Sequence, residues 1–202
     1  MVKKIVNDVI SKELERKFVH IIIGMSLIFI GIKINTIFGL MYLKLFLLAL
    51  TLICLLIDFL IADMKWKIPI YERLQRKHEE QGLHAHTYAL FAILILFEFV
   101  DISIIIAATS MLVFGDAAAA IVGRVFGKHL ISETKTWEGT IAMLIVSMLS
   151  GSFVLGFNIV SIFTAIAATI AEASVNKVND GVSIPLVAGL VGQLISMFLK
   201  YL

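Results

Sequence analysis

Long apolar runs dominate this chain and limit the folds open to it. Of its 202 residues, 60% are hydrophobic, whereas soluble domains are about 45 to 50% apolar. A helix needs roughly 20 apolar residues to cross the hydrocarbon core of a bilayer. Stretches close to this length are predicted as seven membrane spans, at 18–37, 40–62, 86–100, 102–123, 139–157, 159–175 and 183–201. The sequence therefore predicts an all-α polytopic membrane protein.

The distribution of Lys and Arg between the connections supports this span count and gives an orientation. With seven spans, one side of the membrane holds 14 of the 17 basic residues, and the other holds only Lys33, Lys44 and Lys200. Cytoplasmic connections carry an excess of Lys and Arg. The N-terminus and the loops at 63–85 and 124–138 are therefore expected in the cytoplasm, and the protein is expected to lie in the cell membrane.

The chain is expected to form a single domain, 1–202, because it has only 2 Pro and no Gly-rich or Ser-rich linker. Residues 1–17 and 63–85 space their apolar side chains as amphipathic helices at a membrane surface do. The formal net charge of +2 argues against nucleic-acid binding, which needs a strong basic excess. The single cysteine, Cys54, lies inside an apolar run and is interpreted as a small buried hydrophobic residue.

Three carboxylates lie inside predicted spans, where ionisable side chains are costly and usually functional. Asp116 is the clearest of them. It lies about seven residues, or roughly 10 Å, from the inner end of the fourth span, and four alanines follow it, which let neighbouring helices approach closely. Glu172 and Asp58 lie near the inner ends of the sixth and second spans. A carboxylate that pairs with Lys or Arg, or that caps a helix, is the alternative explanation, and it has more weight for Glu172 and Asp58.

A basic segment with several glycines follows Asp116. Glycines let the backbone approach an oxyanion, and Arg and Lys neutralise phosphates. Carboxylates beside a phosphate site suggest Mg²⁺, which binds one or two carboxylates together with phosphate oxygens. The alternative is a set of cytoplasmic charges with glycines at helix ends. The segment is not a Walker A loop, because no Gly-x-x-x-x-Gly-Lys-Ser/Thr motif occurs. The residues concerned are Gly123, Arg124, Gly127 and Lys128, then Lys135, Thr136, Trp137, Glu138 and Gly139.

Other polar residues lie at the inner ends of further spans. Arg16, Lys17 and His20 are at the mouth of the first span, and Asn179 and Asp180 are in the last inner loop. His84 and His86 lie near the third span. Two histidines at this spacing can ligate a metal, but interfacial histidines are common, and that simpler explanation is preferred.

Taken together, these residues resemble the CTP-dependent lipid and polyprenol kinases, which include dolichol kinase, phytol kinase and the CTP-using diacylglycerol kinase. The block at 115–140 is the most specific part of the resemblance. The family usually has Asp-Asn in the last inner loop, whereas this chain has Asp180-Gly181, so a role for that Asn is in doubt. The matching motifs are Arg16-Lys17-x-x-His20, Gly115-Asp116-Ala117-x-Ala119, Gly123-Arg124-x-x-Gly127, Lys135-Thr136-x-Glu138-Gly139, Glu172 and Asp180-x-x-x-x-Pro185-Leu186.

The resemblance implies transfer of a phosphoryl group from CTP to the hydroxyl of a long isoprenoid alcohol, of the dolichol or polyprenol type, with Mg²⁺ as cofactor. It implies that Asp116, Glu172, Asp180 and His20 are catalytic, and that Asp116 and Glu172 hold the metal. Which carboxylate orients the attacking hydroxyl stays open. The residues expected to contact the nucleotide are Arg16, Lys17, Gly115, Gly123, Arg124, Gly127, Lys128, Lys135, Thr136, Glu138 and Gly139.

Two other functions stay open. Phosphatidate cytidylyltransferases share the Gly-Arg and Lys-Thr-x-Glu-Gly patterns, but the chain lacks their Lys-Asp and His-Gly-Gly signature near the C-terminus, so a kinase is favoured. A small transporter would use Asp116 and Glu172 as ion ligands, but the outer halves of the fourth to sixth spans are nearly without polar residues. The acceptor is not settled by the sequence, because isoprenoid, phytol and diacylglycerol tails all require only an apolar groove.

Overall fold

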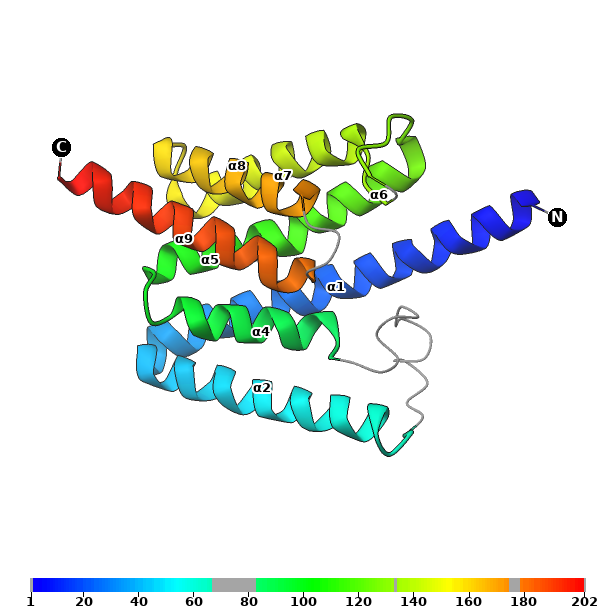
Figure 1. Ribbon diagram of the computed structural model, residues 1–202. Coiled ribbons are helices and arrows are strands. Elements are labelled where there is room, and N and C mark those ends of the chain that lie inside the picture. Colours follow the sequence, from blue (N-terminus) through cyan, green and yellow to red (C-terminus); the bar gives the residue numbers. More distant parts are fainter. Residues whose placement is uncertain (1, 67–82, 133, 175–178, 202) are drawn as a thin grey trace.

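Helices that run alternately between two ends of a bundle make up the structure (Figure 1). The computed structural model describes residues 2–66, 83–132, 134–174 and 179–201. No β-strand occurs within these residues, so the predicted all-α class is confirmed. The elements are α1 (Val2–Phe38), α2 (Leu40–Ala62), α4 (Ala85–Leu96), α5 (Ile102–Ser110), the π-helical segment η2 (Met111–Gly115), α6 (Asp116–Phe126), α7 (Trp137–Leu155), α8 (Ile159–Ser174) and α9 (Asp180–Lys200).

Five helical segments are long and apolar enough to cross a membrane. They correspond to the first, second, fourth, fifth and seventh predicted spans. The predicted third and sixth spans are the shorter apolar helices α4 and α8; the 16 residues of α8 rise only about 24 Å. A polytopic membrane protein is therefore confirmed, while the count of seven and the cytoplasmic N-terminus stay predictions. The five segments are Ser11–Phe38, Leu40–Ala62, Ile102–Phe126, Trp137–Leu155 and Asp180–Lys200.

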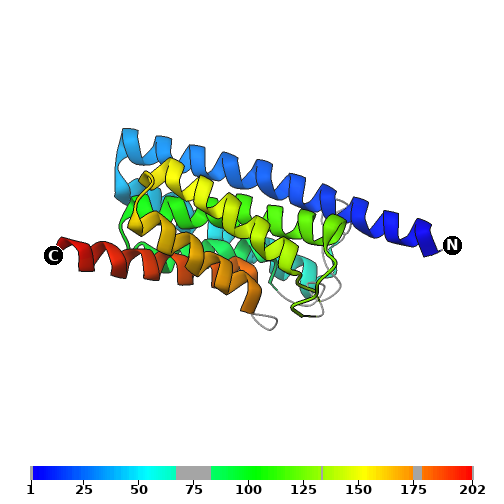
Figure 2. The same ribbon diagram turned by 90° about the horizontal axis from the view of Figure 1, so that it is seen from above.

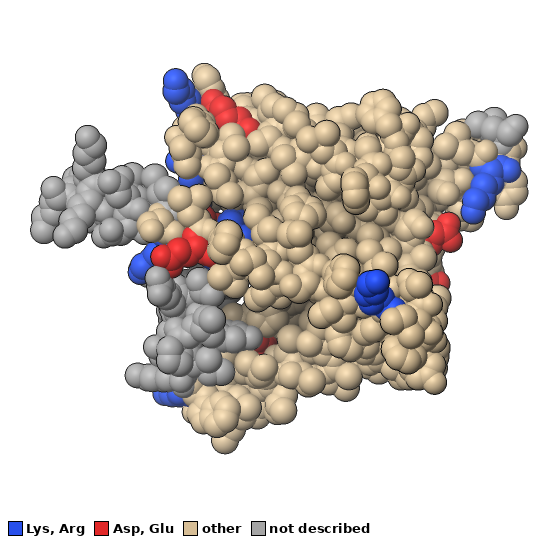
Figure 3. Space-filling view, turned by 180° about the vertical axis from the view of Figure 1, so that it is seen from behind, with Lys and Arg blue, Asp and Glu red and all other residues tan. Residues whose placement is uncertain are grey.

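The ends of the helices and the turns between them gather at two opposite ends of the bundle (Figures 1 and 2). The N-terminus lies at one end with the last residues of α2, α6 and α8 and the first residues of α4, α7 and α9; we call this the inner end. The turns that follow α1, α4 and α7 lie at the outer end with the C-terminus. Figure 3 shows charged side chains near both ends of one face, with a largely uncharged band between them. A bundle that spans a bilayer has this distribution, because charges inside lipid are costly.

The first helix is longer than the sequence prediction. Residues 1–17 were predicted as an amphipathic segment before a span at 18–37, and the structure places both in one continuous helix, α1, from Val2 to Phe38. Residues 2–23 contain neither Gly nor Pro, and Lys, Glu and Arg are good helix formers, so nothing in this stretch ends the helix. Residues 67–82, which hold most of the second predicted surface segment, lie outside the described residues.

The helix that carries Asp116 lies at the centre of the bundle and is irregular. In the most apolar 18-residue stretch of Ile102–Phe126, 72% of the residues are buried. The corresponding stretch of Ser11–Phe38 in α1 has only 6% of its residues buried. Directly before Asp116, the five residues of η2 are π-helical. A π-turn holds an extra residue and so rotates the residues that follow it, and such turns occur frequently at functional sites. Asp116 therefore points in a direction that an uninterrupted α-helix would not give it.

Candidate active site at the inner end

Asp116 forms a buried ion pair with Lys17 between α6 and α1. The Lys17 Nζ donates to Asp116 Oδ2, and the two residues are 99 positions apart in the chain. Their side chains are only 3% and 12% exposed. A lone charge at this depth would be costly, so each residue stabilises the other. The structure thus joins two of the predicted site residues from distant spans.

His20 lies one turn beyond Lys17 on the same side of α1. Its ring is within electrostatic range of Asp116 and within hydrogen-bonding reach of the Leu112 backbone in η2. The Nε2 atom is buried and has no hydrogen-bond partner among the described residues. Buried polar atoms are nearly always paired, so an unpaired one is a candidate for a functional role.

A second cluster connects the α6–α7 loop to α8 and α9. The Lys135 Nζ donates to Glu172 Oε1 at 2.5 Å and to Asp180 Oδ2 at 3.1 Å. Burial alone would lower the pKa of Lys135, but the two carboxylates, Asp180 and Glu172, outweigh it and raise that pKa above its ordinary value. Lys135 is therefore held in its charged form. The second carboxylate oxygen of Glu172, Oε2, is buried without a partner in the described part of the chain.

The two clusters lie near each other at the inner end of the bundle. Asp116 is within electrostatic range of both Glu172 and Asp180, and Asp180 is also within range of Lys17. Three carboxylates and two lysines thus come together from α1, α6, α8, α9 and the α6–α7 loop. The structure brings these predicted site residues into one place, and their catalytic roles stay predictions.

Arg16 and Arg124 lie at the edge of this site, and Glu13 joins them. Glu13 accepts from Arg16 Nη2 at 2.5 Å and from Arg16 Nε at 3.2 Å. Its Oε2 atom is 3.5 Å from Arg124 Nη2. The sequence prediction did not include Glu13, although its spacing of three residues from Arg16 allows contact within one helix.

The glycines predicted to cradle phosphates lie where α6 and α7 pack together. A Cβ atom at Gly139 would lie 2.8 Å from the Ala119 carbonyl oxygen, and one at Gly123 would lie 2.9 Å from Thr136 Oγ1. A Cβ at Gly127 would lie 2.7 Å from Thr136 Cγ2. Thr136 also caps α7, because its Oγ1 accepts from the Gly139 N–H at 3.2 Å. These residues hold the α6–α7 loop close to both helices, and their contact with a nucleotide stays a prediction.

Three further predicted nucleotide ligands, Gly115, Glu138 and Lys128, lie beside α7 or in the α6–α7 loop. Gly115 faces α7, where a Cβ would lie 2.7 Å from the sulfur of Met143. Glu138 Oε1 lies 2.7 Å from His129 Nδ1 and so fastens the α6–α7 loop to the start of α7. Lys128 is exposed in that loop. Nucleotide binding by these three residues also stays a prediction.

Substitution of Gly139 by Ala is expected to destabilise the protein by about 1 to 3 kcal/mol, because the added methyl group meets a backbone carbonyl that cannot rotate away. Denaturant unfolding in detergent measures this change. Gly31→Ala is the matched control, since its Cβ would make an ordinary 3.5 Å contact with Leu43. Equal stability of the two variants would contradict the close packing of α6 and α7.

The carboxylates of the site fit a magnesium ion. The described residues contain no group of three or more His, Cys, Asp or Glu side chains placed to hold a metal on their own. Mg²⁺ does not need such a group, because it binds one or two carboxylates and completes its octahedron with water and phosphate oxygens. The unpartnered Oε2 of Glu172 is a suitable oxygen donor.

Asp58 has a structural role. Its Oδ2 accepts from the His84 N–H at 3.1 Å and from Thr87 Oγ1 at 2.8 Å, and its Oδ1 lies 2.7 Å from His84 Nδ1. These bonds cap the start of α4 and tie it to the end of α2. These bonds favour the structural explanation for Asp58 that the sequence left open.

Asp58→Ala is expected to lower the free energy of unfolding by about 2 to 4 kcal/mol, because it removes three buried hydrogen bonds between α2 and the start of α4. The KM for a nucleotide should not change. Ser26→Ala is a suitable control, since that exposed hydroxyl bonds only the Ile22 carbonyl of its own helix. An unchanged unfolding midpoint for Asp58→Ala would show that the cap is not stabilising.

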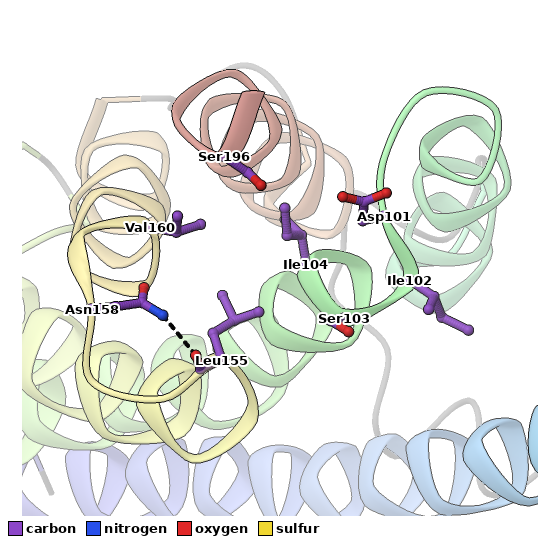
Figure 4. Close-up of a pocket in the computed structure, with 8 residues that line it drawn as sticks. All are labelled: Asp101, Ile102, Ser103, Ile104, Leu155, Asn158, Val160 and Ser196. Carbon is purple, nitrogen blue, oxygen red and sulfur yellow. Dashed lines mark hydrogen bonds between the residues drawn. The ribbon is translucent and has the colours of Figure 1, made fainter. Parts of the chain in front are cut away.

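A cavity of about 440 Å³ lies at the outer end, between the turn before α5, the turn between α7 and α8, and α9 (Figure 4). Two hydrogen bonds join neighbouring segments there: the Asp101 N–H donates to Gln193 Oε1 at 2.9 Å, and Asn158 Nδ2 donates to the Leu155 carbonyl at 2.7 Å. The charged cluster therefore marks the inner end as the candidate active site. The residues that line the outer cavity are Asp101, Ile102, Ser103, Ile104, Leu155, Asn158, Val160 and Ser196.

Comparison with known proteins gives the family of the chain. Residues 8–198 match the model of the cytidylyltransferase family. Over 148 residues the chain is 30% identical to the phytol kinase of Synechocystis sp., and this match covers 65% of the chain and 62% of the relative, less than two thirds of that protein's length. No solved structure matches the chain significantly. The predicted resemblance to CTP-dependent lipid kinases is thus confirmed, and the chain belongs to the cytidylyltransferase family.

Proposed function

We propose that this protein transfers the γ-phosphoryl group of CTP to the hydroxyl of a membrane isoprenoid alcohol at the inner end of the bundle. The observation that carries the proposal is the cluster of Asp116, Glu172 and Asp180 with Lys17 and Lys135, in a chain similar to a phytol kinase. A charged site at the end of an apolar bundle is accessible both to a water-soluble nucleotide and to the hydroxyl of a lipid. The excess of Lys and Arg on this side favours the cytoplasm as its location.

The basic residues would bind the triphosphate. Lys17 and Lys135 pair with carboxylates, and their flexible ammonium groups can turn to phosphate oxygens. Arg16, Arg124 and Lys128 lie nearer the solvent and would hold the outer phosphates. Phosphoryl transfer depends chiefly on positioning and on electrostatic stabilisation of the transferred group, so a cluster of cations suits it.

Asp116 and Glu172 would hold Mg²⁺. When bound, the ion would neutralise phosphate charge and help to orient the β- and γ-phosphates. His20 lies beside Asp116, and its unpaired Nε2 would hydrogen-bond a phosphate oxygen or a hydroxyl. The three side chains would thus keep the reacting groups in one arrangement.

Asp180 would orient the acceptor. Its side chain is 22% exposed, compared with 12% for Asp116 and 5% for Glu172, so it is the carboxylate most accessible to an incoming hydroxyl. The hydroxyl oxygen forms a bond to the γ-phosphorus while the bond from that phosphorus to the β,γ-bridging oxygen breaks. Asp180 takes the hydroxyl proton, and the products are the alcohol monophosphate and CDP.

An acceptor panel tests this function. Purified full-length protein in detergent is incubated with CTP and phytol, a polyprenol or a diacylglycerol, with ATP as a competing donor. We expect an isoprenoid monophosphate and one CDP for each product molecule, with little effect of ATP. Failure to phosphorylate any alcohol would overturn the proposal.

The description of the matching family favours a second candidate, a cytidylyltransferase. That reaction would join the cytidylyl group of CTP to a phosphorylated lipid and release pyrophosphate. The same cluster of cations and carboxylates would bind CTP in either case. Measurement of the soluble product separates the two reactions, because a kinase releases CDP and a cytidylyltransferase releases pyrophosphate.

A further inference from the structure

Glu13 is a buried carboxylate to which the proposed reaction assigns no role. It lies in the first turn of the span Ser11–Phe38, and only 9% of the residue is exposed. A charge in this position is costly unless it is paired. Its partners among the described residues include two guanidinium groups from different helices, Arg16 on α1 and Arg124 on α6.

The contacts of Glu13 fix both guanidinium groups. Arg16 donates through Nε and Nη2 to the two carboxylate oxygens, at 3.2 and 2.5 Å, which is the two-point geometry that sets the plane of a guanidinium group. Arg124 meets the same carboxylate through one Nη2 atom at 3.5 Å, and its side chain is 41% exposed. Arg124 therefore lies at the open edge of the site, held at one corner.

Charge also argues for this arrangement. Two guanidinium groups side by side repel each other, and the carboxylate between them reduces that repulsion. Arg16 is within electrostatic range of Asp116, so the set adjoins the carboxylate and lysine cluster. A polyphosphate that enters from the inner end would meet these two arginines first.

We propose that Glu13 is a positioning residue for the nucleotide, which holds Arg16 and Arg124 so that both guanidinium groups face the phosphates of CTP. The inference rests on the proposed function, because it takes these arginines as phosphate ligands. Glu13 itself would touch neither CTP nor the lipid. Its effect should therefore appear in nucleotide binding and not in the chemical step.

Steady-state kinetics of Glu13→Gln with CTP varied tests the inference. Gln keeps the shape of the side chain but loses the charge that orients the arginines. We expect the KM for CTP to rise about tenfold, with kcat within about threefold of wild type and the KM for the alcohol unchanged. Glu13→Asp keeps the charge and should give a KM for CTP between those of wild type and Glu13→Gln. Glu98→Gln is the matched control, since that exposed carboxylate pairs with Lys44 at 2.8 Å near the outer end.

A double-mutant cycle separates positioning from general stability. If Glu13 acts through Arg124, then Glu13→Gln should raise the KM for CTP by less than about threefold in a protein that already carries Arg124→Gln. Full additivity of the two effects would overturn the inference. So would an active Glu13→Gln variant with an unchanged KM for CTP, or one that loses kcat and thermal stability together at an unchanged KM.

A direct measurement of CTP binding tests the role of Glu13 without relying on phosphoryl transfer. If wild-type protein phosphorylates no alcohol, the proposed function fails, but equilibrium dialysis with CTP still tests Glu13. We expect Glu13→Gln to weaken CTP binding about tenfold. Equal binding by wild type and Glu13→Gln would overturn the inference.

Discussion

Asp116→Asn is expected to lower the rate of lipid phosphorylation by about 100-fold or more, because Asn cannot supply the charge that the reacting groups require. The side chain keeps its size, so the packing around α6 should survive. The initial rate of alcohol monophosphate formation at saturating CTP measures the effect. A variant with normal CTP-dependent activity would show that Asp116 is not part of the catalytic site.

The stability of this variant needs a control, because Asp116→Asn leaves Lys17 buried without its partner. Loss of one member of a buried pair is strongly destabilising, whereas loss of both can be neutral. The double variant Lys17→Met with Asp116→Asn should therefore unfold closer to wild type while it stays inactive. Asp101→Asn, at the exposed outer pair with Lys200, should change neither property.

Lys135→Met is expected to destabilise the protein by about 2 to 4 kcal/mol, because it leaves the buried carboxylate of Glu172 and the half-buried one of Asp180 without their shared cation. The same change should abolish detectable activity, since Lys135 is also a proposed phosphate ligand. Denaturant unfolding in detergent gives the stability, and the rate of product formation gives the activity.

Lys128→Met provides the control for stability, because that lysine is exposed in the same loop and surface charges contribute little to folding. We expect its unfolding midpoint to match that of wild type. Equal stability of Lys135→Met and Lys128→Met would contradict the ion-pair cluster described at the inner end.

The all-helical class and five of the spans could be predicted because lipid imposes a simple rule. A backbone in hydrocarbon must satisfy its own hydrogen bonds, so an apolar run of about 20 residues is read as a helix. The shorter runs at α4 and α8 gave the correct positions of helices, but their length does not establish that they cross the membrane. The continuous helix from Val2 to Phe38 could not be foreseen, because apolar periodicity does not show where a helix of good helix formers ends.

The charged cluster could be predicted in part for a similar reason. Helices of alternating direction bring their inner ends together, so Asp116, Glu172 and Lys135 were expected at one face of the membrane. Which lysine meets which carboxylate depends on the order of the helices around the bundle. That order cannot be deduced from the sequence alone. Glu13 was missed because a carboxylate in a charged N-terminal stretch looks like a surface residue until α6 is placed beside it.

The glycines and the π-turn show a different limit of prediction from sequence. Gly123 and Gly139 were predicted to cradle phosphates, which stays a prediction, and the structure adds that their lack of a side chain admits Thr136 and the Ala119 carbonyl. The same residue type serves both purposes, so motif spacing alone cannot separate them. The run Met111–Gly115 looks like any other apolar segment, and nothing in it predicts a π-helical turn.

The central claim is that the inner-end cluster moves the γ-phosphate of CTP to a lipid hydroxyl. CTP that carries one label on the γ-phosphate and another on the cytosine tests it most directly, with purified protein, phytol or a polyprenol as acceptor, and extraction of the lipid. We predict that the γ-phosphate label enters the lipid while the cytosine label stays in water with CDP. Cytosine label in the lipid, or no label there at all, would contradict the claim.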